Sequence, residues 1–328
     1  MSGTPENSDT NRPLTGEDLD LSWRESLDRD VARGDGSELR GGSVNQVYFL
    51  GTTYCNHWPV SEQEEVLHNL WYLYYRGAQL FAHDSPEQDR DDKNTWEIAT
   101  VSTGEVIWSE LPFFVSDTTE YWVKDCETMS ATQRANFSRF YAKVAAAGVG
   151  RDKLFQTALI IFRDTLETER ALGTPGKEEQ VGVNPGRTMK DLTVADLLPS
   201  ALAWFWEAKG NIIWLTNEQW KDCPDSLAAE GGPLFKTSEL GTSAAPGFSA
   251  DRYIFWLKRP DQTAKEADEA GNKALSKLAL SITEQMLLLF HSRDCLLKDE
   301  IEAAGEIVET TEWITESMGN VHLAFKSH

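Results

Sequence analysis

The sequence predicts an all-α fold, namely a single multi-helix domain built as an irregular helical bundle. Two observations favour this fold class. Apolar side chains recur at steps of three and four residues through nearly every long segment, which is the period of an amphipathic helix. Ser61 with Glu64, and Ser130 with Gln133, have the spacing of a capping box at a helix start. No convincing run of residues alternates with the two-residue period of a strand.

The N-terminal part of the chain is predicted to begin with a disordered tail over residues 1–18, which are polar and contain proline and glycine. A first amphipathic helix is expected over Leu19–Ala32, ending at Arg33-Gly34. We expect a loop over Asp35–Gly42. The short apolar run Val44–Leu50 fits either a strand or a buried helix, because so short a run does not distinguish them.

The next helix is predicted from the capping box at Ser61 and from Pro59 just before it. Its apolar stripe consists of Leu67, Leu70, Trp71, Tyr74, Ala78 and Phe81. A further helix should start at Ser85-Pro86, with serine as the cap and proline at the first helical position. Because the body of that helix is strongly charged, we expect a solvated element.

Two more helices are predicted in the middle of the chain. The capping box at Ser130 opens a helix whose apolar stripe consists of Phe137, Phe140, Tyr141 and Val144. Asp152 is then expected to cap an almost fully apolar helix that ends at Gly173-Thr174-Pro175. A helix that is apolar on most sides is a central one.

In the C-terminal half, Thr193 is expected to restart the helical pattern, and Pro199 to kink that helix or begin it anew. Ser249 should start a short helix that stops before Pro260. The last long helix is predicted over Thr263–Arg293. All these helices are assigned to one domain over residues 19–300, followed by an acidic C-terminal extension over residues 301–328.

Charge and composition exclude several classes of partner. The chain has 53 acidic and 31 basic side chains, which gives a net charge of −22. Such a surface repels phosphate backbones and anionic lipid, so neither nucleic acid nor a membrane is expected as a partner. No stretch approaches the ~18 consecutive apolar residues of a membrane-spanning helix. With no secretory pattern at the polar N-terminus and four scattered cysteines, we expect a cytoplasmic, reduced protein.

Three segments suggest a family. They are WYLYYRGAQLFAHDSPEQD (Trp71–Asp89), GEVIWSELPFF (Gly104–Phe114) and GFSADRYIFWLKRPDQTAKEA (Gly247–Ala267), with LLPSALAWFWEAKGNIIWL between the last two. In this order and spacing, over residues 20–295, the chain resembles the fungal family named domain of unknown function 3632. The resemblance implies a largely helical protein and brings no reaction and no functional residues. One departure is the charged run Arg90–Lys93, where the family pattern would continue the helix with apolar residues.

An all-α terpene cyclase is the most specific enzyme class that the sequence suggests. Asp91-Asp92 with Glu97 has the look of a carboxylate cluster for Mg²⁺ and diphosphate, in a chain rich in aromatic residues. Such an enzyme needs a second metal-binding cluster on a facing helix. The nearest candidate, Asn272 with Ser276, has Leu280 where a carboxylate is required. A half-motif without its partner does not support this chemistry.

Other catalytic and binding motifs are incomplete, so neither a metal nor another cofactor is predicted. Cys55-x-His57 has no second pair at zinc spacing. His68 lies on a predicted helix and is interpreted as a surface or satisfied core histidine. The sequence around Ser249 lacks the final glycine of a nucleophile elbow, so Ser249 is interpreted as a helix cap. The phosphate-binding loops of common nucleotide sites are absent.

The sequence therefore favours a non-catalytic binding or protein-interaction module, whose partner is an unknown protein or a small apolar ligand. The alternative is an enzyme of fungal secondary metabolism with an aromatic-lined helical cavity. Trp204, Phe205 and Trp206 are consecutive and span about 200° of a helix, more than one packing interface covers. Any pocket is predicted to be lined by Trp204 or Trp206 together with Trp71, Trp108 or Trp256.

Overall fold

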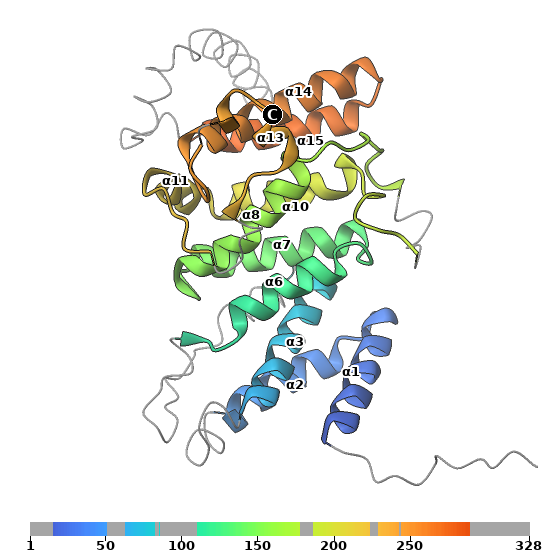
Figure 1. Ribbon diagram of the computed structural model, residues 1–328. Helices are drawn as coiled ribbons and strands as arrows, with labels where there is room; N and C mark the ends of the chain where they lie inside the picture. Colours follow the sequence, from blue (N-terminus) through green and yellow to red (C-terminus); the bar gives the residue numbers. More distant parts are fainter. Residues whose placement is uncertain are drawn as a thin grey trace, which may run out of the picture. The chain divides into compact units, whose positions relative to one another are not determined.

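The computed structural model of the chain is all-α, as the sequence predicts (Figure 1). It describes residues 16–50, 63–82, 85, 110–177, 186–223, 229–242 and 244–288, and every regular element in these ranges is a helix. Backbone contacts divide the chain into two compact units. Unit 1 comprises Met1–Ala82 and Thr95–Asp117, and unit 2 comprises His83–Asn94 and Thr118–His328. The single domain over 19–300 stays a prediction, and both predicted tails lie outside the described residues except at positions 16–18.

Unit 1 contains α1 (Gly16–Ala32), α2 (Ser37–Phe49) and α3 (Glu64–Leu80), and both α1 and α2 pack against α3. The prediction of a loop over Asp35–Gly42 is wrong, because α2 begins at Ser37 and includes Gly41 and Gly42. The Asp35 carboxylate accepts a hydrogen bond from the Ser37 backbone N–H at 2.9 Å, which supports this helix start.

One of the two glycines in α2, Gly42, lies beside α3, whereas a Cβ placed on Gly41 would have no atom within 4 Å. A Cβ placed on Gly42 would lie 3.4 Å from a methyl group of Leu73 in α3, so the two helices approach closely there. Residues 44–49, which fit either a strand or a buried helix from the sequence, belong to this helix.

α3 begins later than the capping box at Ser61 predicts. Its N-cap is Gln63, whose side chain makes no capping hydrogen bond, and Ser61 lies outside the described residues. The predicted stripe is confirmed, because all six of its residues are at most 8% exposed: Leu67, Leu70, Trp71, Tyr74, Ala78 and Phe81. The helix predicted at Ser85-Pro86 lies outside the described residues, apart from Ser85 itself.

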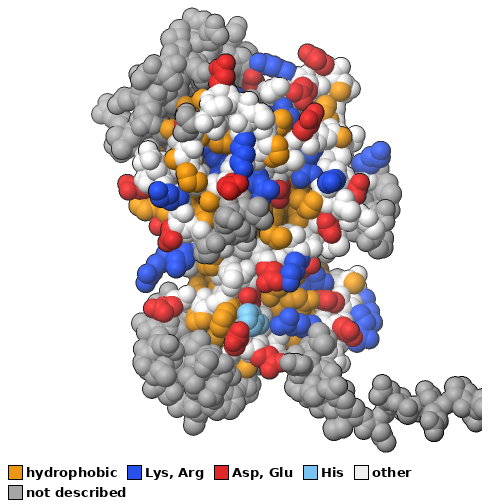
Figure 2. Space-filling model, viewed as in Figure 1, with side chains coloured by type: hydrophobic (Ala, Val, Ile, Leu, Met, Phe, Trp, Pro, Cys, Tyr) orange, Lys and Arg blue, Asp and Glu red, His pale blue; other side chains and the backbone are white. Residues whose placement is uncertain are grey.

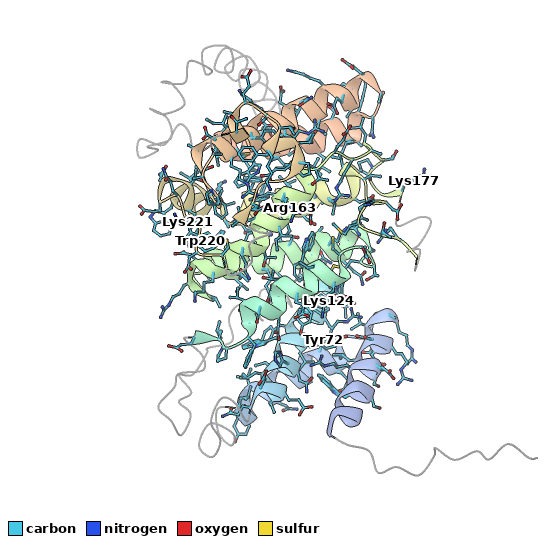
Figure 3. All side chains as sticks on the ribbon, in the orientation of Figure 1. Tyr72, Lys124, Arg163, Lys177, Trp220 and Lys221 are labelled. Atoms are coloured by element: carbon cyan, nitrogen blue, oxygen red, sulfur yellow. The ribbon has the colours of Figure 1, made fainter. Side chains whose placement is uncertain are left out.

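Polar side chains join α1 to α3. The Tyr72 hydroxyl (Figure 3) donates to Asp28 at 2.5 Å, and Arg76 Nε lies 3.0 Å from the same carboxylate. Burial, together with this hydrogen bond, raises the pKa of Tyr72, so the hydroxyl stays protonated and remains a donor. Arg24 Nε donates to Asn69 Oδ1 at 2.9 Å, and its guanidinium lies 5.0 Å from the centre of the Tyr72 ring.

α6 (Phe114–Asp125) begins in unit 1 and continues into unit 2, where α7 (Ala131–Ala146) follows. The capping box predicted for α7 is confirmed. Ser130 Oγ accepts from the Gln133 N–H at 3.2 Å, and the Gln133 side chain accepts from the Ser130 N–H at 2.8 Å. The predicted stripe of α7 is buried as well, namely Phe137, Phe140, Tyr141 and Val144.

η3 (Arg151–Leu154) and α8 (Phe155–Leu166) come next, and most of α8 is buried, as its predicted central position requires. Both predicted ends of this helix are wrong. Asp152 lies inside η3 instead of capping α8, and α8 stops at Leu166, well before Gly173. Side chains of Thr168 and Arg170 donate to backbone carbonyls of the last turn, at 2.9 and 2.6 Å. These bonds satisfy carbonyl groups that the helix end would otherwise leave unpaired.

The remaining helices are α10 (Val194–Glu207), α11 (Lys209–Asn217), α13 (Pro233–Lys236), η4 (Leu240–Thr242), α14 (Ala250–Glu269) and α15 (Lys273–Leu287). α10 packs against α7, α8, α11 and α15, and α14 packs along α15 (Figure 1). α10 therefore occupies a central position in unit 2. Within the described ranges, none of the helices has the length and apolarity that a membrane span needs.

The predicted and observed C-terminal helices differ at two prolines and one glycine. α10 starts after Thr193 as predicted, but it continues through Pro199. α14 likewise continues through Pro260, which is buried, so the short helix predicted after Ser249 is wrong. Over residues 263–287, the single helix predicted over Thr263–Arg293 is in fact the end of α14 and all of α15, and residues 289–293 lie outside the described residues. The two helices are separated at Gly271, whose φ is +74°, a conformation that favours glycine.

Replacement of Ser130 by alanine should lower the free energy of unfolding by about 1 kcal/mol, because it removes the capping hydrogen bond of α7. Equilibrium urea unfolding measures this change. The matched control is Ser281→Ala, because the Ser281 hydroxyl donates within its own helix, to Lys277 O at 3.0 Å. Equal losses for the two variants would contradict the role of Ser130 as a cap.

Candidate functional site

The structure describes four of the five tryptophans of the predicted pocket and places them in different surroundings. Trp204 and Trp256 lie in unit 2 and are 0% exposed, whereas Trp71 lies in unit 1 and is 1% exposed. Trp206 is 47% exposed. Trp108 lies outside the described residues. The spread of residues 204–206 around α10 is as predicted, since one of the three side chains faces solvent.

Trp204 and Trp256 belong to one cluster of rings in unit 2, made up of Phe155, Phe162, Trp204, Phe205, Phe248 and Trp256. The Trp204 ring centre lies 5.6 Å from that of Phe155, and Trp256 lies 4.9 Å from Phe162 and 5.7 Å from Phe248. These are ordinary separations for packed aromatic side chains. The pocket itself stays a prediction.

A buried ion pair, here called the Glu167 centre, lies beside this cluster. Glu167 follows α8 and is 0% exposed, and Arg252 of α14 is 1% exposed. Arg252 Nε lies 2.6 Å from Glu167 Oε1, and Nη2 lies 3.2 Å from Oε2, which makes the pair bidentate. Trp256 Nε1 donates to Oε1 at 2.6 Å, and the Gly232 backbone N–H donates to Oε2 at 2.5 Å.

The remaining guanidinium donors also have partners. Arg252 Nη1 lies 3.2 Å from the carbonyl oxygen of Ala229 and 2.9 Å from that of Gly247. Its Nη2 lies 3.5 Å from the carbonyl oxygen of Glu230. All five N–H groups of the guanidinium can thus be assigned an acceptor, and the carboxylate accepts four donors. Because protein groups occupy these positions, we interpret the Glu167 centre as structural.

Two tryptophans with large exposed fractions lie on α10 and α11. Trp206 is 47% exposed at the end of α10, and Trp214 is 50% exposed in α11. The Arg139 guanidinium of α7 lies 5.6 Å from the centre of the Trp206 ring, within the range of a cation–π contact. Arg139 Nε also lies 2.5 Å from Glu207 Oε1, so the arginine is fixed beside the indole. We call Trp206, Trp214 and Arg139 the tryptophan surface.

Unit 1 contains a histidine–aspartate pair that joins α3 to the start of α6. His68 Nδ1 lies 2.6 Å from Asp117 Oδ2, and the two side chains are 31% and 8% exposed. His68 is the one histidine in the described ranges, and Figure 2 shows pale-blue histidine atoms at the surface beside apolar and acidic atoms. The interpretation of His68 as a satisfied histidine fits this bond. Its partner is 49 residues away, and no motif in the sequence predicts it.

The turn before α6 has a strained backbone next to His68. Leu111 and Phe113 have φ values of +45° and +65°, a conformation that costs a non-glycine residue about 1–3 kcal/mol. Trp71 Nε1 donates to the Pro112 carbonyl oxygen at 2.8 Å and so holds the centre of this turn. The Phe113 ring centre lies 4.7 Å from that of His68. The turn therefore fixes an aromatic ring beside the imidazole.

The residues weighed for a metal site are not brought together in the described ranges. Asn272, a candidate for the second cyclase cluster, is instead the N-cap of α15, where it accepts from the Leu275 N–H at 3.2 Å. Asp91, Asp92 and Glu97 lie outside the described residues. Among the residues that are described, no group of three or more His, Cys, Asp or Glu side chains has a metal-binding arrangement.

Comparison with known proteins gives one family and one relative. A family model described as "Protein of unknown function (DUF3632)" matches residues 55–259. The "Oxopyrrolidines biosynthesis cluster protein G" of Penicillium oxalicum (strain 114-2 / CGMCC 5302) is 36% identical over 292 residues, which cover 83% of this chain and 80% of the relative. No solved structure matches the chain.

Replacement of Gly232 by alanine should destabilise the protein by about 1–3 kcal/mol, the usual effect of overpacking. A Cβ at this position would lie 2.7 Å from both the Cβ and the carbonyl oxygen of Glu167, so the Glu167 centre would have to shift. The matched control is Gly210→Ala in α11, where no atom lies within 4 Å of the added Cβ.

The control should be as stable as the wild type or gain about 0.5–1 kcal/mol, because alanine favours helix over glycine. Urea unfolding of both variants checks the pair. A Gly232→Ala protein as stable as Gly210→Ala would contradict the tight packing around Glu167.

Proposed function

The chain belongs to the DUF3632 family, and from this premise we propose that it acts in fungal secondary metabolism as a protein that binds a protein partner. The pathway context comes from the relative, which is named as a protein of an oxopyrrolidines biosynthesis cluster. Protein binding, as opposed to some other role in such a pathway, is supported by the tryptophan surface.

The observation that carries this proposal is the exposure of Trp206. A tryptophan with 47% of its surface in solvent, held by an arginine from a neighbouring helix, is an unusual use of a large apolar side chain. Tryptophan and arginine are the residues most enriched among those that dominate binding energy at protein interfaces. Trp214, which is 50% exposed in the next helix, adds further apolar area.

The alternative, an enzyme with an aromatic-lined cavity, has less support from the described residues. Trp204 and Trp256 have no exposed surface, and their rings lie against phenylalanine side chains at packing distance. The Trp256 indole N–H already donates to Glu167. A small apolar ligand, the other partner considered from the sequence, would need space between these rings. Protein binding at the tryptophan surface requires no such rearrangement.

The Trp206→Ala, Trp214→Ala double variant should bind the partner at least about 30-fold more weakly than the wild type, because even one residue of this kind contributes about 2 kcal/mol or more at an interface. The partner is identified by purifying the tagged chain from its native fungus, and titration calorimetry with the two purified proteins then gives the Kd. Unfolding midpoints show that the variant is folded.

Val123→Ala is the matched control, since Val123 is 52% exposed on a different helix, α6. It should bind like the wild type. Wild-type affinity in the double variant would contradict the proposed surface.

A further inference from the structure

The geometry of the histidine–aspartate pair determines which ring nitrogen is available. An ionised carboxylate only accepts hydrogen bonds, so the 2.6 Å contact with Asp117 places a proton on His68 Nδ1. In the neutral ring, Nε2 then carries the lone pair. Asp117 is 8% exposed, so the protein shields this contact from competition by water. The pair thus holds the imidazole in one tautomer and one orientation.

The opposite edge of the ring is open to a ligand. His68 is 31% exposed, and Nε2 lies 3.6 Å from Glu64 Oε1, which is beyond a normal hydrogen bond. Both groups that face this position, the Nε2 lone pair and the Glu64 carboxylate, are acceptors. The position therefore suits a hydrogen-bond donor, and the Phe113 ring beside the imidazole offers an apolar contact for the rest of the molecule.

The strained turn is an independent observation at the same place. Two of its three central residues, Leu111 and Phe113, adopt left-handed backbone conformations that are unfavourable for their side chains. Such strain persists only where the surroundings enforce it, and it clusters at functional sites. Here the surroundings are Trp71, which holds Pro112, and α6, whose Asp117 N–H donates to the Phe113 carbonyl at 2.8 Å. The strain sets the position of the ring that flanks His68.

We propose that His68 is a general base, positioned by Asp117, that takes a proton from a hydroxyl group of a small molecule bound between His68 and Glu64. The O–H bond of the ligand breaks, the oxygen keeps the electron pair, and a new N–H bond forms at Nε2. Asp117 stabilises the resulting imidazolium. The oxygen then forms a bond to an electrophilic carbon of the same molecule, and the bond from that carbon to its leaving group breaks. The proton passes from Nε2 to the leaving group, which returns the ring to its neutral form, so no second reactant is required.

This role goes beyond partner binding and belongs to a different part of the chain. The tryptophan surface lies on α7, α10 and α11 of unit 2, whereas His68, Asp117 and Glu64 lie in unit 1. A variant that no longer binds the partner would therefore still allow the role of His68 to be measured, and a variant of His68 would still allow partner binding to be measured. His68 is the residue that touches the ligand, and Asp117 acts through it.

Two measurements on the full-length chain test the proposal. The first is the ¹⁵N chemical shift of the His68 ring, which should report a protonated Nδ1 and an unprotonated Nε2 in the wild type. The second is the rate at which diethyl pyrocarbonate modifies each of the six histidines, followed by peptide mass spectrometry. The other five histidines serve as internal controls.

We expect diethyl pyrocarbonate to modify His68 faster than an unpaired histidine with the same exposed fraction. Asp117→Asn should lower this rate about tenfold, because it favours the other tautomer. Glu64→Gln should leave the tautomer unchanged, because Glu64 lies beyond hydrogen-bond distance of the ring. A proton on Nε2 in the wild type would overturn the proposal without the need for any variant. So would a folded Asp117→Asn protein in which His68 reacts at the wild-type rate.

Discussion

A single buried carboxylate connects much of unit 2. Glu167, just past the end of α8, binds Arg252 and Trp256 of α14 and the backbone N–H of Gly232. A buried charge is tolerable only when opposite charge and hydrogen bonds replace the water it has lost. Here the carboxylate accepts four donors. Through it, the end of α8, the start of α14 and the connection around residues 229–232 become one packed structure.

The consequences extend along the remaining helices of unit 2. α14 packs along α15, and α15 packs against α10, which also contacts α7 and α8. The segment 247–267, which suggests the family from sequence, supplies much of this structure. Gly247 has a φ of +83°, and a Cβ there would lie 2.2 Å from the Trp220 carbonyl oxygen. Ser249 caps α14 by accepting from the Arg252 N–H at 3.3 Å. Gly247, Ser249, Arg252 and Trp256 of this segment therefore each have a role in folding.

Local patterns in the sequence predict the local parts of the fold. The capping box at Ser130 and the buried stripes of α3 and α7 are confirmed because each depends on residues within one helix. Some of the predictions that fail depend on distant residues. Pro260 removes one backbone hydrogen bond from α14, and packing against neighbouring elements compensates for that loss, so the helix continues. The rule that a proline ends a helix takes no account of such packing. The end of α8, by contrast, depends on nearby residues, because Thr168 and Arg170 donate to carbonyl groups of its last turn.

At the candidate sites as well, the sequence predicts local features but not contacts between distant residues. Helix geometry spreads Trp204, Phe205 and Trp206 around α10, so the sequence predicts that one of them faces another layer, a cavity or solvent. The structure places Trp206 in solvent. The His68–Asp117 bond spans 49 residues and the Glu167–Arg252 pair spans 85, and neither has a motif at short range. For the His68–Asp117 bond, the nearest signal in the sequence is the run Leu111–Phe114. Its strained backbone becomes apparent only in the folded chain.

The free energy of unfolding of Glu167→Gln tests most directly whether the Glu167 centre is structural. We predict a loss of about 3–5 kcal/mol, because the substitution leaves Arg252 charged, buried and without its counter-ion. Glu207→Gln is the comparison, since it removes the carboxylate of the Arg139 pair, in which the side chains are 24% and 19% exposed. That variant should lose about 1 kcal/mol or less. If Glu167→Gln were as stable as Glu207→Gln, the charge at Glu167 would be unnecessary for folding, and its burial would have to be explained by function.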